Sequence, residues 1–145
     1  MFKHILIPTD GSDLSAIAIK NGVKFAKEIN ARITGLTVTA PFHYYALDAM
    51  QISATAEQYD TDAQTVATRN LSELQKAALE AGVQCELLHR VNERPYEEIV
   101  EVAKEKGCDV IFQASHGRSG AKALLLGSET NKVLTHCKIP VLVFR

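Results

Sequence analysis

The chain has 145 residues, of which 46% are apolar and 23% are charged, and its formal net charge is −1. This length fits one domain with a substantial core, and the composition is that of an ordinary soluble protein. The balanced charge gives no electrostatic support for binding nucleic acid, and no apolar run is long enough to cross a membrane. The start of the chain has no signal-peptide pattern, so we expect one cytoplasmic domain over residues 1–145.

Short apolar runs alternate along the chain with segments of helical periodicity. In chain order they predict a strand at 4–8, a helix at 14–29, a strand at 33–38, a helix at 63–78, a strand at 85–91, a helix at 95–106, a strand at 109–113, a helix at 129–137 and a strand at 140–144. Ser12 is placed to cap the first helix, and Pro95 to begin the third. The stretch 41–59 holds aromatic residues without a clear period.

This alternation predicts the fold class. Strands that alternate with helices form a parallel sheet covered on both faces, here a single-domain, Rossmann-like, three-layer α/β/α sandwich with five parallel strands. In such sheets ligands bind at the carboxyl ends of the strands, where the strand order reverses. Two turns are therefore candidate sites together, residues 8–12 after the first strand and residues 114–120 after the fourth.

The second of these turns has the composition of an anion-binding loop. It reads Ala114-Ser115-His116-Gly117-Arg118-Ser119-Gly120, and nine residues separate Gly117 from Gly127-Ser128, which opens the fourth helix. Glycines let main-chain N–H groups approach a phosphate, and the first N–H groups of a helix lack an internal partner. The chain has neither a G-x-G-x-x-G after the first strand nor the Walker A spacing.

Residues along nearly the whole chain carry a family resemblance. They are Ile7-Pro8-Thr9-Asp10-Gly11-Ser12, Pro95-Tyr96-Glu97-Glu98-Ile99, Ser115-His116-Gly117-Arg118-Ser119-Gly120, Leu125-Leu126-Gly127-Ser128 and Ile139-Pro140-Val141-Leu142-Val143. In order and spacing they resemble the universal stress protein family. The resemblance implies a five-stranded parallel domain, usually dimeric, and one branch of the family binds ATP through G-x2-G-x9-G-[S/T]. Gly117, Gly127 and Ser128 match the last three elements of that pattern.

The resemblance also implies a site for an adenine nucleotide, ATP or AMP. Asp10 and Val38 would contact the adenine, and residues 114–117 would hold the ribose and the first phosphates. The start of the fourth helix would hold the outer phosphates. A Mg or Mn ion would be present only where it is bridged by those phosphates. The site residues expected on this basis are Pro8, Thr9, Asp10, Val38, Gln113, Ala114, His116, Gly117, Gly127, Ser128, Glu129 and Thr130.

Four residues depart from the family pattern. Ala114 stands where the first glycine belongs, and it is unstrained there only at negative φ. Glu93 and Gln113 replace small or apolar residues, and Glu129 adds a carboxylate beside Ser128. That carboxylate suits the helix dipole but would repel a triphosphate. AMP or ADP stay open as ligands, and so does a domain that binds no nucleotide and acts as a dimerisation or interaction module.

Several site residues also have a purely structural interpretation. Asp10 fits an adenine contact or an Asx turn, and Ser128 fits a phosphate ligand or a helix cap. His116 fits a loop brace better than a general base, because no carboxylate stands at a useful spacing. We name no catalytic residue and no metal site, so weak ATPase activity or self-phosphorylation is the most that we expect. The loop 10–15 lacks the paired glycines of adenylating enzymes, and adenylation is a third hypothesis.

Three further features concern surfaces rather than the site. The last strand, from Pro140 to Phe144, is apolar without alternation, and at a sheet edge it would pair with a second copy in a homodimer. The aromatic run Phe42-His43-Tyr44-Tyr45 fits either a lid over a ligand or packing on the domain. The cysteines, an odd number without C-x-x-C spacing, indicate reduced thiols, and Cys137 is expected in the core.

Overall fold

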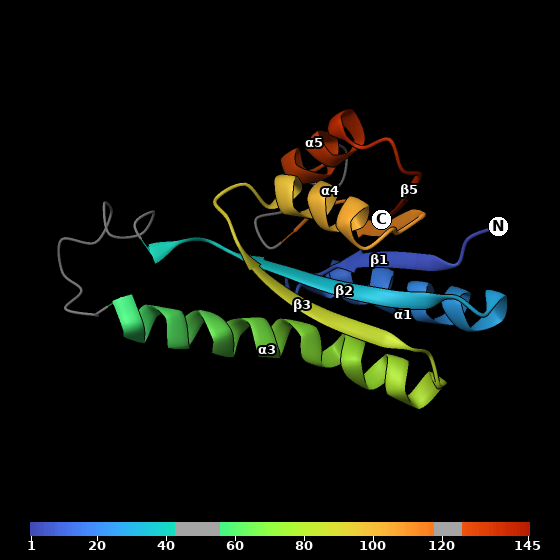
Figure 1. Cartoon of the computed structure of the whole chain (residues 1–145), viewed down its shortest axis with the longest axis horizontal. Coiled ribbons are helices and arrows are strands. Elements are labelled where there is room, and N and C mark those ends of the chain that lie inside the picture. Colours follow the sequence, from blue (N-terminus) through green and yellow to red (C-terminus); the bar gives the residue numbers. More distant parts are fainter. Residues whose placement is uncertain (43–55, 118–125) are drawn as a thin grey trace.

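Five parallel strands form the centre of the molecule, with helices on both faces (Figure 1). The computed structural model describes residues 1–42, 56–117 and 126–145. The elements are β1 (His4–Pro8), α1 (Asp13–Ile29), β2 (Arg32–Thr39), α3 (Ala56–Ala81), β3 (Cys85–Val91), α4 (Pro95–Glu105), β4 (Val110–Ala114), α5 (Ser128–His136) and β5 (Val141–Phe144). The strand order is β3-β2-β1-β4-β5. The prediction of a five-stranded parallel α/β fold is confirmed.

The alternating side chains of the central strands separate two cores. Ile5, Ile7 and Phe112 point to the face that α1 and α3 cover, where they pack with Ile19 and Leu74. Neighbouring strand residues point to the opposite face and pack against α4 and α5; this second core contains Leu6, Leu36, Ile99, Val102, Ala103, Cys108, Ile111 and Val133. Each fully buried aliphatic side chain stabilises the fold by about 1.5–3 kcal/mol. Figure 1 shows the resulting three layers.

Polar residues determine where α1 begins and ends. The Ser12 hydroxyl accepts a hydrogen bond from the Ser15 N–H at 3.2 Å, so the predicted cap is confirmed. Asn30 ends the helix in the left-handed conformation, with φ of 55°. In the described part of the chain it is the only non-glycine residue with a positive φ.

One element begins earlier than the sequence predicts. Helix α3 starts at Ala56, so part of the stretch 41–59 is helical rather than irregular. Its first turns are largely exposed, and without a buried face they show no apolar period. Tyr59 ties this end to the sheet, because its hydroxyl donates to the Ala40 carbonyl at 2.7 Å and its ring packs edge-on to Phe42. The other elements match their predicted positions to within about one residue at each predicted boundary.

Strand β5 lies at the edge of the sheet, as the dimer prediction requires. All three cysteines are free, and burial raises the pKa of the Cys108 thiol to about 11. Cys137 is only partly buried beside the second core. Residues 43–45 of the proposed lid lie outside the described residues. Among the helices described, none has the length and apolarity to cross a membrane.

A buried histidine makes the stability of the fold depend on pH. The His4 side chain, on β1, contacts β2, with its Nε2 atom 2.7 Å from the Thr34 hydroxyl, and the residue is only 5% exposed. Burial, aided by the charge of Arg32, lowers the pKa of His4 below its ordinary value. The unfolded chain therefore binds a proton more readily than the folded chain in this range.

We predict that the free energy of unfolding is highest above about pH 6.5 and falls as the pH drops towards the folded-state pKa of His4. Urea unfolding at a series of pH values measures this slope, which approaches about 1.4 kcal/mol per pH unit for one group. The His4→Gln variant should have a flatter profile than the wild type. Burial also lowers the pKa of His89, so His89→Gln is the matched comparison and keeps the His4 contribution. Equal slopes in the wild type and His4→Gln would contradict the prediction.

Candidate functional site

A cavity of about 730 Å³ opens at the carboxyl ends of the strands. It lies where β1 pairs with both β2 and β4, which is the point where the strand order reverses. Small-molecule sites in proteins enclose about 300–1,000 Å³, and open α/β sheets place them at this switch point. The cavity therefore has both the size and the position of a ligand site.

All the residues predicted for the site line this cavity. They are Pro8, Thr9, Asp10, Val38, Gln113, Ala114, His116, Gly117, Gly127, Ser128, Glu129 and Thr130. The sequence did not single out other lining residues as site residues: Ser15, Leu36, Ala40, Asn92, Pro95, Ile99 and Leu126, while Glu93 was noted only as a departure from the family pattern. Leu36 has the strand period of Val38 on the same face, and Asn92 follows β3 at the same edge. From these two features the sequence could have predicted Leu36 and Asn92 as site residues.

The first turn of the cavity is built around Asp10. Its Oδ1 atom accepts a hydrogen bond from the Ser12 N–H at 3.0 Å, which is an Asx turn. Gly11, with φ of 76°, supplies the left-handed residue of the turn. The turn thus serves to start α1, and this gives no support to the adenylation hypothesis for the loop 10–15. The Oδ2 atom lies against Gly117, where an added Cβ would come within 2.5 Å.

The second turn is joined tightly to the start of α5. The Gly127 N–H donates to the Ser115 carbonyl at 2.8 Å, and a Cβ on Gly127 would lie 2.9 Å from that oxygen. Gly127 is the N-cap of α5, so the interpretation of Ser128 as the cap is wrong; Ser128 is the first helical residue. The N–H groups of the first helical turn have no carbonyl inside the helix to bond. They are donors at the edge of the cavity.

Thr130 also holds α5 against β4. Its hydroxyl lies 3.0 Å from the Ala114 carbonyl and 3.2 Å from that of Ser115, and the residue is 3% exposed. Backbone carbonyls therefore already engage the hydroxyl of this residue, which the sequence predicted for the site. The backbone N–H of Thr130, in the first turn of α5, has no carbonyl inside the helix to bond.

The departures at the end of β4 are accommodated without strain. Ala114 continues the strand, and its φ is not positive, so the methyl group costs no backbone strain. Gln113 is 7% exposed, and its Nε2 atom reaches the Thr130 hydroxyl at 3.4 Å. Its Oε1 atom is buried and has no hydrogen-bond partner in the structure described. Three other buried polar atoms, His4 Nδ1, Asn70 Oδ1 and Arg90 Nε, also lack a partner among the described residues, but only Gln113 lines the cavity.

His116 contacts the residue that precedes it. The Nδ1 atom of His116 lies 3.0 Å from the hydroxyl of the adjacent Ser115, a contact that braces the loop. Across the described residues, no group of three or more His, Cys, Asp or Glu side chains is arranged to hold a metal ion. Arg118 and the rest of the predicted loop up to residue 125 lie outside the described residues.

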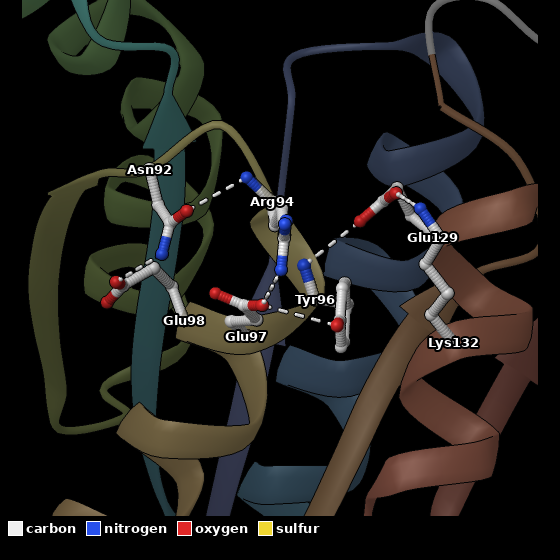
Figure 2. A network of polar contacts seen from close by, with 7 residues as sticks. All are labelled: Asn92, Arg94, Tyr96, Glu97, Glu98, Glu129 and Lys132. Carbon is white, nitrogen blue, oxygen red and sulfur yellow. Dashed lines mark hydrogen bonds and ion pairs between the residues drawn. The ribbon is translucent and has the colours of Figure 1, made fainter.

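A charged network joins the starts of α4 and α5 (Figure 2). The Glu129 Oε2 atom accepts a hydrogen bond from the Tyr96 N–H at 3.0 Å, and its Oε1 atom lies 2.8 Å from the Lys132 Nζ atom. Glu97 pairs with Arg94 at 3.0 Å in the same network. The sequence left the direction of the Glu129 side chain open; the structure turns it towards α4.

Comparison with known proteins places this geometry in a family. The sequence model of the universal stress protein family matches residues 1–145. Universal stress protein YxiE of Bacillus subtilis is 36% identical over the whole length of both chains. The solved structure of MJ0577, a universal stress protein of Methanocaldococcus jannaschii, superposes with a TM-score of 0.84 at 28% identity and covers 99% of this chain and 96% of its own. A universal stress protein solved in complex with cAMP has a TM-score of 0.72 at 25% identity, with 99% and 97% covered.

The fold, the switch-point cavity and these matches define the class: a single α/β domain of the universal stress type. The chain belongs to the universal stress protein family.

We predict that removing the Thr130 hydroxyl loosens the junction between β4 and α5. The Thr130→Val variant keeps the shape of the side chain but leaves the Ala114 and Ser115 carbonyls without this donor, which should cost about 1–3 kcal/mol of unfolding free energy. Urea unfolding measures the loss. Thr135→Val is the control, because Thr135 is exposed on the same helix and its hydroxyl donates to the Asn131 carbonyl within α5. Equal losses in the two variants would contradict this role of Thr130.

Proposed function

We propose that the protein binds an adenine nucleotide in the switch-point cavity and acts as a regulatory or sensing module. The observation that carries this proposal is the meeting of two surfaces in one cavity of about 730 Å³: an apolar slot and the N-terminal turn of α5. A nucleotide has the same division, since its base is flat and largely apolar on its faces while its phosphates are anionic.

The apolar slot is formed by Leu36 and Val38 on β2 and by Ile99 on α4. In the proposed complex the adenine lies there, with Asp10 and the backbone of Pro8 and Thr9 at its edge. The ribose lies over residues 113–117, where the unpaired Gln113 amide oxygen is available to a hydroxyl donor. The phosphate group lies at Gly127 and Ser128, against the first N–H groups of α5.

The relative solved in complex with cAMP supports this proposal, because it shares the fold over almost the full length of both chains. The serine–histidine contact beside the cavity, between Ser115 and His116 at 3.0 Å, joins neighbouring residues of one loop, and we propose that it braces the loop. We therefore propose binding rather than turnover. A divalent cation is expected only where phosphates bridge it, because the described side chains form no cluster of their own for a metal.

We predict that adenine nucleotides raise the thermal midpoint of the protein and that GTP does not. A ligand at about 100 times its dissociation constant adds about 2.7 kcal/mol of stability. Gly127→Val should abolish the shift, because a side chain there collides with the Ser115 carbonyl, and Gly117→Val should do the same by displacing Asp10. Ser72→Val, on an exposed face of α3, is the control for added bulk. Nucleotide shifts of wild-type size in both glycine variants would refute the site.

We also propose that the protein forms a homodimer through β5. This strand is at the sheet edge, and Leu142 is 47% exposed there. An apolar edge strand presents unpaired backbone groups that a second copy would pair.

The Val143→Lys variant should shift the population from dimer to monomer, because it places a charge on the pairing strand. Sedimentation velocity at micromolar concentration measures the effect. Leu79→Lys is the control, since Leu79 is 80% exposed on α3. A monomeric wild type, or a Val143→Lys protein as dimeric as the wild type, would contradict the assignment of the interface.

A further inference from the structure

The Glu129 carboxylate lies at the cavity, where the N-termini of α4 and α5 come together. Glu129 is in the first turn of α5, and its Oε2 atom accepts the Tyr96 N–H of α4 at 3.0 Å. Figure 2 shows the side chain bridging the two helices. Glu129 lines the cavity together with Ser128 and Gly127, the residues at which the phosphate is proposed to lie.

The contact with Tyr96 has a local cause in the sequence of α4. Arg94, the N-cap of that helix, makes no side-chain capping bond, and Pro95 has no N–H to donate. Tyr96 carries the first free donor of the helix. Because the helix cannot cap itself, α5 supplies the acceptor, and the Glu129 carboxylate is held in place at the cavity by a bond that does not depend on a ligand.

The negative charge of Glu129 is only partly compensated. Its partner Lys132 is one helical turn away and lies 2.8 Å from the other carboxylate oxygen, with 47% of its side chain exposed. The hydrogen bond and charge of Glu129 raise the pKa of Lys132, so Lys132 keeps its positive charge near neutral pH. An exposed pair of this kind is screened by water and leaves a residual field at the cavity.

We infer that Glu129 makes the site selective for adenine nucleotides with a single phosphate group over ATP. This inference rests on the proposed nucleotide function. A monophosphate is held by the first N–H groups of α5, from Ser128 onwards, because the Gly127 N–H is already bonded to the Ser115 carbonyl. A longer phosphate chain extends along the same turn, towards a carboxylate that cannot move away without uncapping α4. Each added phosphate brings further negative charge to that carboxylate.

The test measures the affinity of wild type and two variants for AMP and for ATP by calorimetric titration. EDTA is present throughout, so that no divalent cation neutralises the phosphates. Glu129→Gln keeps the size of the side chain and an oxygen for the Tyr96 N–H, and removes the charge. Glu97→Gln is the matched control: it removes the same charge from the same network, but Glu97 pairs with Arg94 and does not line the cavity.

We expect the wild type to bind AMP more tightly than ATP. Glu129→Gln should tighten ATP binding by about tenfold, the scale of one unit charge near a protein surface after screening, and change AMP binding by much less. Glu97→Gln should leave the ratio of the two affinities at its wild-type value. Raising the salt concentration should reduce the difference between the AMP and ATP affinities more in the wild type than in Glu129→Gln.

Two outcomes overturn the inference while leaving the proposed function standing: a wild type that prefers ATP, or an AMP-to-ATP ratio that is the same in the wild type and in Glu129→Gln. A third outcome would overturn both the inference and the proposed function: neither nucleotide binds to any of the three proteins. Thermal midpoints measured without nucleotide, equal to within a few degrees, establish that the variants remain folded.

Discussion

The close approach of the Gly127 N–H to the Ser115 carbonyl is the contact on which the cavity depends. It joins the end of a central strand to the start of the last helix at 2.8 Å. No side chain fits between them, because a Cβ on Gly127 would lie 2.9 Å from the carbonyl oxygen. Thr130 reinforces the junction from within the first turn. The helix start is thereby fixed at the carboxyl edge of the sheet, where its unpaired N–H groups face the cavity.

The pattern of backbone geometry was predictable from the sequence, and the direction of side chains was not. Local features were predictable because each depends on residues that are close together in the sequence. They are the spacing from Gly117 to Gly127, the Asx turn at Asp10 and the cap at Ser12. Glu129 is different, since its acceptor role depends on Tyr96, 33 residues earlier in the chain. Thr130 likewise turns to carbonyls of β4 that only the folded sheet brings near it.

Helix α3 shows a second limit, which concerns periodicity. Its later turns bury Ala67, Leu71, Leu74 and Ala78, and that stripe predicts the helix well. Its first turns extend beyond the sheet and are largely exposed, so they carry no apolar stripe. The helix continues there because Tyr59 anchors it to the Ala40 carbonyl. A contact of that kind, between a side chain and a distant backbone group, leaves no periodic trace in the sequence.

Polar contacts within the protein hold the walls of the cavity in place without a ligand. The start of α4 has its acceptor in Glu129, the Thr130 hydroxyl has its carbonyls, and Asp10 closes its own turn. A ligand therefore does not have to order these elements, and binding does not incur that entropic cost. Among the described residues that line the cavity, the groups left unsatisfied are the Gln113 amide oxygen and the first N–H groups of α5. In the proposed complex the ribose of the nucleotide supplies a hydroxyl donor for the first of these groups, and its phosphate supplies the anion for the second.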